Sequence, residues 1–214
     1  YKKDQKTYRV KSFNLSAYEQ NGTKSMTLNS DFLDASLDGV FNVRDLSGSI
    51  QQLFLKYLPS FFDEKIKSKK IPSQNFEYDL AFKNTSDVTS LFTPYLTISP
   101  KTSVHGRFNS SENAFTFAAS SPRLSLFGYV MSDLTINSSA DKDLKLNVQT
   151  HRLYISDSVW MNDFDVTAHT YSDSVNLAIN WDNKTQKINK GDIKAFMAVK
   201  KANSFEVKIQ PSEF

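Results

Sequence analysis

The chain reads Phe76-Glu77-Tyr78-Asp79-Leu80-Ala81-Phe82, with a large apolar side chain at every second position. Successive side chains of a β-strand point to opposite faces, so this alternation predicts a strand with one apolar and one polar face. The same period of two recurs at residues 33–41, 144–148, 175–181 and 207–209. Many such strands in succession predict one long apolar surface. Whether that surface is a closed core or an open groove decides what the protein does.

Composition limits the classes of protein to consider. The chain has 214 residues, 23% of them charged, and a formal net charge of only +3, far from the concentrated positive field of a nucleic-acid-binding protein. The absence of cysteine excludes disulfides, thiolate metal sites and thiol catalysis. No apolar run approaches the roughly 20 residues of a membrane-spanning helix. Because the chain begins at Tyr1 without a visible signal peptide, we expect it to be a fragment of a longer protein.

The period changes to helical spacing after residue 45. Leu46, Ile50 and Leu53 follow a potential cap at Asp45 and predict a longer helix at 45–62 within a helical insertion at 45–72. Lysines follow this helix, so two interpretations stay open: a helix lying on a membrane surface, or a helix covering one end of the sheet. A second, short helix is predicted at 86–92.

The remaining segments predict strands. Asn21-Gly22 is a hairpin signal, and a change of phase at Phe32 predicts a bulge inside one long strand at 24–43. Further turns are predicted, among them one at Ser120-Ser121-Pro122. The fold predicted for residues 1–214 is therefore mainly β: one continuous unit with an elongated, curved antiparallel sheet that forms an open apolar groove.

Motifs for catalysis are absent from the sequence. His105, His151 and His169 lie far apart on predicted strands, and no phosphate-binding loop or metal-ligand motif occurs. We therefore predict no enzyme activity, no cofactor and no metal site. Two alternatives stay open: a surface or secreted β-sandwich that binds glycans through Trp160, Trp181 and tyrosines, and a hydrolase with a carboxylate pair.

Several motifs resemble the repeating units of TamB-like proteins of the AsmA superfamily. They are Ser30-Asp31-Phe32-Leu33-Asp34-Ala35-Ser36-Leu37-Asp38-Gly39, Tyr57-Leu58-Pro59-Ser60, Val175-Asn176-Leu177, Trp181-Asp182-Asn183, Gly191-Asp192-Ile193 and Pro211-Ser212. The resemblance implies a β-taco-like groove in the periplasm, within a longer protein anchored in the inner membrane. It also implies lipid transport or outer-membrane protein assembly, with phospholipid acyl chains as ligands. An outer-membrane barrel partner would be engaged by other parts of that longer protein.

The phase of each predicted strand gives the residues expected to line the groove and to contact acyl chains or a hydrophobic segment. They are Leu37, Phe41, Phe76, Leu80, Leu126, Leu146, Val148, Ile155, Val166, Leu177 and Ile179. A shift of one residue in the register of a strand would move all of its lining residues to the other face of the sheet. The choice of face is therefore a separate prediction.

Overall fold

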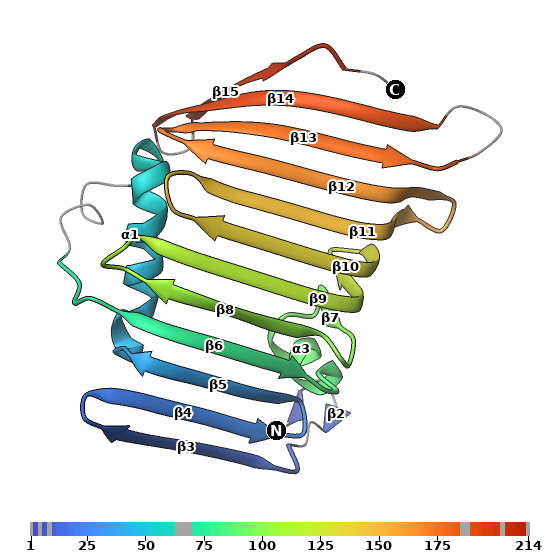
Figure 1. Cartoon of the computed structure of the whole chain (residues 1–214). Helices are drawn as coiled ribbons and strands as arrows, with labels where there is room; N and C mark the ends of the chain where they lie inside the picture. The colour runs from blue at the N-terminus through green and yellow to red at the C-terminus, as the bar shows by residue number, and fades with distance from the viewer. Residues whose placement is uncertain are drawn as a thin grey trace.

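The computed structural model of the chain describes residues 2–3, 6–7, 10–62, 70–184, 189–201 and 204–212. Within this part of the chain, 13 strands form one open antiparallel sheet (Figure 1). A separate pair consists of β1 (Lys2–Lys3) and β2 (Lys6–Thr7). The large sheet contains β3 (Phe13–Gln20), β4 (Thr23–Ser30), β5 (Leu33–Val40), β6 (Asn75–Phe82), β7 (Leu96–Ile98), β8 (Ser103–Asn109), β9 (Ala114–Leu126), β10 (Tyr129–Ala140), β11 (Leu144–Ser156), β12 (Val159–Tyr171), β13 (Ser174–Asp182), β14 (Lys190–Lys201) and β15 (Ser204–Ile209).

The strands follow one another in chain order from β3 to β15, apart from β7, which pairs only with β9. Two excursions leave the sheet. The first contains α1 (Leu46–Tyr57) between two 3₁₀ turns, Val43–Asp45 and Pro59–Phe61. The second contains α3 (Ser86–Phe92) and β7. Among the described residues, no helix is long and apolar enough to cross a membrane.

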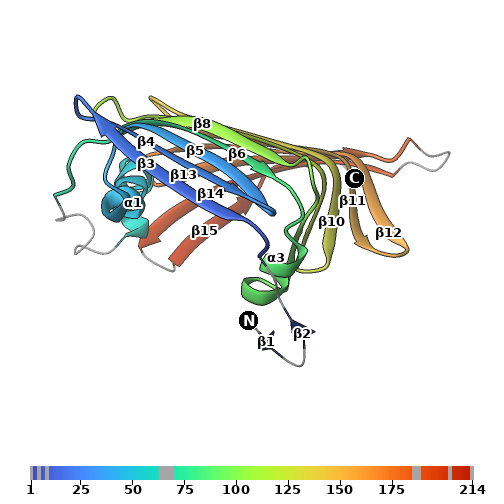
Figure 2. The same cartoon turned by 90° about the horizontal axis from the view of Figure 1, so that it is seen from below.

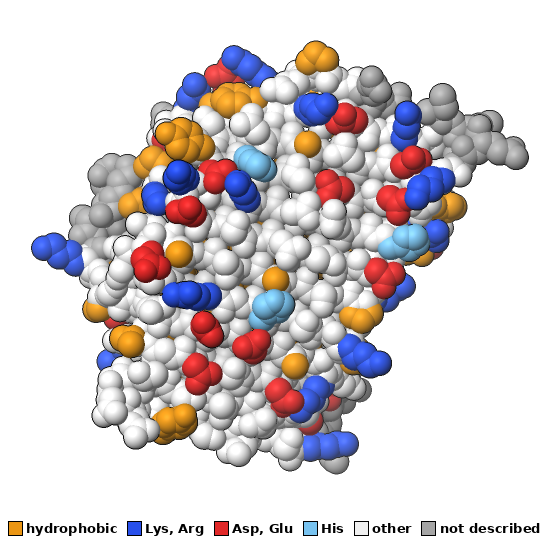
Figure 3. All heavy atoms as spheres, viewed as in Figure 1, with side chains coloured by type: hydrophobic (Ala, Val, Ile, Leu, Met, Phe, Trp, Pro, Cys, Tyr) orange, Lys and Arg blue, Asp and Glu red, His pale blue; other side chains and the backbone are white. Residues whose placement is uncertain are grey.

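The sheet is curved, and both helices lie on its concave side. Figure 2 shows α1 and α3 on the same side, at opposite ends of the strands. The predicted fold is therefore confirmed: the protein is mainly β, with an open and curved antiparallel sheet. Charged side chains and histidines are spread over the opposite, convex face (Figure 3).

Tight turns at three hairpins use backbone conformations with positive φ. These pairs are Asn21-Gly22 (φ 52° and 78°), Phe127-Gly128 (52° and 88°) and Ser172-Asp173 (46° and 59°). Two successive residues with positive φ define the type I′ turn, whose twist matches that of the flanking strands. The predicted hairpin at Asn21-Gly22 is confirmed.

Two predictions about strand ends are wrong. Residues 24–43 do not form one bulged strand: β4 and β5 are separate, and the phase changes because the chain turns at Asp31-Phe32. There is also no turn at Ser120-Ser121-Pro122, because β9 continues through it and turns at Phe127-Gly128. The Ser121 hydroxyl is buried beside Thr102, with the two side-chain oxygens 2.7 Å apart, so this polar residue belongs to the sheet.

The other boundaries differ by smaller amounts. The predicted segments 143–149 and 152–156 form one strand, β11, and the first strand of the large sheet lies at 13–20 instead of 8–18. Helix α3 confirms the prediction at 86–92. Helix α1 ends at Tyr57 instead of residue 62, because Leu58 precedes a proline and leaves the helical region (φ −132°, ψ 58°). Lys65, Lys67 and Lys69 lie outside the described residues.

A bend crosses the sheet near one end of its longer strands. Asp133 in β10 and Asp163 in β12 have positive φ (51° and 47°) although both lie inside strands. Strand pairing skips Asp133 on both sides and skips Asp163 on the side of β11. Beyond them, β10, β11 and β12 turn toward the helix side of the sheet (Figure 2).

Candidate functional site

The concave face is continuously apolar because the strand registers align the apolar phase of each strand. Directly paired residues of antiparallel strands share a face. One row of paired residues crosses the sheet from β3 to β14: Leu15, Leu28, Ala35, Leu80, Val104, Ala119, Ile136, Val148, Val166, Ile179 and Ile193. Every member of this row is apolar.

Two further rows run beside it on the same face. The second contains Ala17, Met26, Leu37, Tyr78, Gly106, Phe117, Ser138, Leu146, Ala168, Leu177, Ala195 and Ile209. The third contains Gly39, Phe76, Phe108, Phe115, Ala140, Leu144, Thr170, Val175, Met197 and Val207. Beyond Gly39 the third row continues in β4 and β3 as Lys24 and Glu19, which form an ion pair at 3.7 Å. No other residue of the three rows is charged. The concave face is therefore an apolar lane that runs across the strands.

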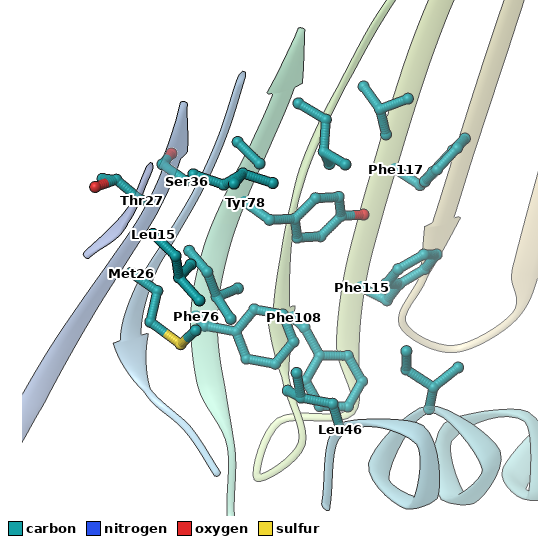
Figure 4. A pocket seen from close by; sticks show the side chains of 16 residues that line it. Leu15, Met26, Thr27, Ser36, Leu46, Phe76, Tyr78, Phe108, Phe115 and Phe117 are labelled. Carbon is teal, nitrogen blue, oxygen red and sulfur yellow. The ribbon is translucent and has the colours of Figure 1, made fainter. Parts of the chain in front are cut away.

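The lane deepens into a cavity of about 570 Å³ between α1 and strands β3, β4, β5, β6, β8 and β9. Its apolar lining comes from all three rows and from Leu46 and Ile50 of α1. Figure 4 shows the rings of Phe76, Tyr78 and Phe108 pointing into this space, whereas Thr27 and Ser36 turn away from the rings. A space of this size, open on one side and almost without polar groups, suits a hydrocarbon group.

Tyr78 and Gly106 form part of the cavity floor. The Tyr78 ring lies across β8 at Gly106, where a Cβ atom would collide with the ring and with the Thr116 carbonyl. The phenol donates a hydrogen bond to that carbonyl oxygen at 3.0 Å, so its polar end is directed into the backbone and not into the cavity. Burial raises the pKa of Tyr78 to about 12. The phenol therefore stays uncharged at neutral pH, and the floor stays apolar.

An aromatic cluster fixes α1 along one side of the lane, at the ends of the strands (Figure 1). The Phe76 and Phe108 rings stack with centroids 5.3 Å apart, and Phe41 meets Phe76 edge-on at 6.1 Å. Leu53 and Tyr57 of α1 pack against this cluster and are almost fully buried. Burial of this apolar side accounts for the position of the helix, because it removes the most hydrophobic side chains from water.

Polar contacts hold the end of α1. The Tyr57 hydroxyl donates to the Asp141 carbonyl at 2.7 Å, and the backbone amide of Asp173 donates to the Tyr57 carbonyl at 2.9 Å. The Asp173 carboxylate accepts hydrogen bonds from the Ser60 amide (2.7 Å) and hydroxyl (2.8 Å). Helix α1 thus covers the sheet at one end of its strands, which agrees with the second of the two interpretations left open by the sequence.

Most of the predicted lining residues lie in the three rows or beside them. Leu37, Phe76 and Leu80 line the cavity, and Leu146, Val148, Val166, Leu177 and Ile179 continue the lane toward β14. Phe41 is buried in the cluster beneath α1. Leu126 and Ile155 differ, because each lies beyond the bend. In β9 the row residues have odd numbers and in β11 they have even numbers, whereas Leu126 is even and Ile155 is odd. The registers therefore do not connect these two residues to the lane.

Other cavity residues were missed by the sequence reasoning. Met26, Val104, Phe108, Phe115 and Phe117 line the cavity and show the same alternation as the residues that were chosen. Their signal was present in the sequence, but the predicted lining included no residue of β4, of β8 or of the part of β9 that borders the cavity. Gly106 beneath Tyr78 had no local signal, because that contact depends on the register between β6 and β8.

The convex face has ordinary surface electrostatics. His151 lies 3.6 Å from the Asp163 carboxylate, and His169 lies 3.8 Å from Asp143. A hydrogen bond from Lys184 holds the pKa of Asp163 below its usual value. In the described part of the chain, no group of three or more acidic or histidine side chains could hold a metal ion.

The aromatic residues of the glycan-binding alternative have separate surroundings. The Arg152 guanidinium lies over the rings of Tyr154 (5.6 Å) and Trp160 (6.0 Å). The Trp181 indole instead covers Gly191, where a Cβ atom would collide with it. Trp160 is 41% exposed, but none of the ring contacts among the described residues joins the two indoles.

Comparisons with protein-family models, with curated proteins and with solved structures find no match to this chain.

Proposed function

We propose that the concave face binds lipid acyl chains, and that the protein is a noncatalytic lipid-carrying module. The observation that carries this proposal is the uninterrupted apolar row from Leu15 to Ile193, on the face of an open sheet. A closed barrel fills its interior with its own side chains, whereas the open lane keeps apolar surface that a ligand can cover.

The energetics favour hydrocarbon over a polar ligand. Transfer of one methylene from water to an apolar site contributes about 0.8 kcal/mol, so a chain of several methylenes needs no specific polar contact. The cavity lining offers almost no hydrogen-bonding groups, and Tyr78 uses its hydroxyl internally. An acyl chain lying along the rows would cover side chains that are now half-exposed.

The cellular setting is part of the same proposal. The motif resemblance supports placement in a TamB-like protein in the periplasm, acting in phospholipid transport between membranes or in outer-membrane protein assembly. The curved, open sheet is compatible with that placement. A barrel partner in the outer membrane would bind to other parts of such a protein.

Binding of single-chain fatty acids of increasing length to the delipidated protein tests the proposal. If each added methylene enters the lane, the dissociation constant falls about fourfold per methylene until the lane is filled. Val104→Gln places an amide in the lane and should weaken binding, whereas His105→Gln changes the adjacent, outward side chain and should not. Affinity that does not depend on chain length, or saturable binding of a sugar on a glycan array, would contradict the proposal.

A further inference from the structure

Strand β15 leaves an exposed edge at one end of the sheet. Among the described residues it pairs with β14 alone. Its three concave-face side chains, Phe205, Val207 and Ile209, are 52%, 59% and 74% exposed. An edge strand with unpaired backbone groups and exposed apolar side chains is a template for pairing with another chain.

The register shows which backbone groups are free. The Gln210 amide donates to the Lys194 carbonyl at 2.8 Å, so the even-numbered residues of β15 exchange hydrogen bonds with β14. The Asn183 amide donates to the Asn189 carbonyl at 3.0 Å, so the odd-numbered residues of β14 form hydrogen bonds with β13. The even-numbered residues of β14 are then left to bond with β15, as the Gln210 contact also indicates. Hydrogen-bonded and non-hydrogen-bonded pairs alternate along antiparallel strands. The N–H and C=O groups of Phe205, Val207 and Ile209 therefore point outward from the edge.

We propose that two copies of this chain form a dimer through their β15 edges, with a twofold axis passing at Val207. In this register Val207 pairs with Val207 of the second copy, and Phe205 pairs with Ile209 on either side. All three residues present free backbone groups, so each of the three pairs exchanges two N–H···O bonds. The inference concerns the sheet edge and does not depend on the proposed lipid function.

Charge selects this register over its neighbours. Within each copy Glu206 already forms ion pairs with Lys200 (3.3 Å) and Lys208 (3.1 Å) on the convex face. In the proposed dimer Glu206 of one copy would also lie opposite Lys208 of the other, in a non-hydrogen-bonded pair where side chains approach most closely. A shift of the pairing by two residues in one direction would place Glu206 opposite Glu206. The same shift in the other direction would place Lys208 opposite Lys208. Opposite charges across strands stabilise pairing and like charges oppose it.

The opposite edge of the sheet lacks this complementarity. Strand β3 carries Asn14, Ser16 and Tyr18 on its convex face, so pairing of β3 with β15 would leave Glu206 and Lys208 without a charged partner across the interface. Pairing of β3 with β15 would also be a head-to-tail contact that builds rings or filaments, whereas pairing of β15 with itself closes as a dimer. The twofold axis is perpendicular to the sheet, so both apolar lanes face the same side and meet at the interface.

Sedimentation velocity of the lipid-free chain over a wide concentration range tests the dimer. We expect a monomer–dimer equilibrium. Glu206→Lys and Lys208→Glu each create like-charge pairs at both symmetry-related positions, and each should raise the dissociation constant at least about tenfold. The double variant E206K/K208E restores opposite charges across the interface and should restore dimerisation. Glu19→Lys changes the net charge by the same amount as E206K, but on β3, and should have no effect.

Oxidative cross-linking gives a second readout that does not depend on charge. The chain contains no cysteine, so Val207→Cys introduces a single thiol at the axis. Hydrogen-bonded pairs have Cα atoms about 5.5 Å apart, within the range of a disulfide. Phe205→Cys is the matched control, because the two introduced thiols would be separated by about four residues of strand, or roughly 13 Å. A wild-type monomer at all concentrations, growth beyond a dimer, failure of the double variant to restore pairing, or equal cross-linking at both positions would overturn the proposal.

Discussion

Phe108 is the buried side chain whose removal should damage the groove most. It is 1% exposed, stacks on Phe76 at 5.3 Å, and lies beneath the cluster that holds α1. Truncation of a fully buried phenylalanine to alanine costs about 3–5 kcal/mol, because the transfer free energy is lost and a cavity remains. Since this site already adjoins a cavity of about 570 Å³, the surroundings cannot collapse to refill it, and we expect the upper half of that range.

Urea unfolding followed by circular dichroism measures the effect of Phe108→Ala. Thermal unfolding gives a second readout: for a chain of this size each kcal/mol corresponds to roughly 2–4 °C in Tm, so a loss of about 4 kcal/mol lowers Tm by roughly 8–16 °C. Phe92→Ala is the matched control, because this phenylalanine at the end of α3 is 74% exposed and its truncation should change the free energy of unfolding by no more than about 0.5 kcal/mol. Equal, small losses for the two variants would refute the assignment of Phe108 to the core that fixes α1.

The other predictions concern Gly106 in the cavity floor, the titration of the Tyr78 phenol, and the contact of Asp173 with Ser60 at the end of α1. Gly106→Ala inserts a methyl group against the Tyr78 ring and the Thr116 carbonyl and should lower the free energy of unfolding by about 1–3 kcal/mol in the same urea assay; no loss would show that Tyr78 does not lie there. Because the pKa of Tyr78 is about 12 in the folded protein against an ordinary value of 10.0, its contribution to stability is present below pH 10 and is lost as pH rises toward 12. Tyr78→Phe should therefore flatten the pH dependence of stability in that window, and an unchanged dependence would contradict the burial. Asp173→Ala removes both hydrogen bonds to Ser60 and should cost about 1–3 kcal/mol, whereas Asp157→Ala at the exposed β11–β12 turn should cost little; equal thermal unfolding of the two variants would argue against the anchor.

The sequence predicted the strands well because alternation is a local property. A half-exposed strand must alternate wherever its partners lie, so the strand at 103–109 could be recognised without knowing the sheet. The errors arise where tertiary contacts override local preference. Ser121 looks like a turn residue, yet its hydroxyl is satisfied by Thr102 inside the sheet. Phe32 looks like a strand residue, yet it lies in the turn between β4 and β5.

The lane itself could be predicted only in part. Residues such as Leu80, Val148 and Ile179 follow from the phase of their own strands. Their alignment into one row depends on registers between strands, which no local pattern fixes. Leu126 and Ile155 do not follow from this phase, because each lies beyond the bend near Asp133 and Asp163 and differs in phase from the row residues of its own strand. Aspartate tolerates positive φ better than most residues, so an aspartate inside an apolar strand was the available signal for that bend.

Photo-crosslinking of paired inward and outward positions in cells tests the central claim most directly. A photoreactive residue at Val104 or Leu177 lies in the apolar lane, whereas His105 and Asn176 are their neighbours on the convex face. We predict that phospholipid is captured at Val104 and Leu177 and not at His105 and Asn176. Equal capture at the inward and outward positions, or no lipid at any of the four, would contradict the account of the concave face as an acyl-chain lane.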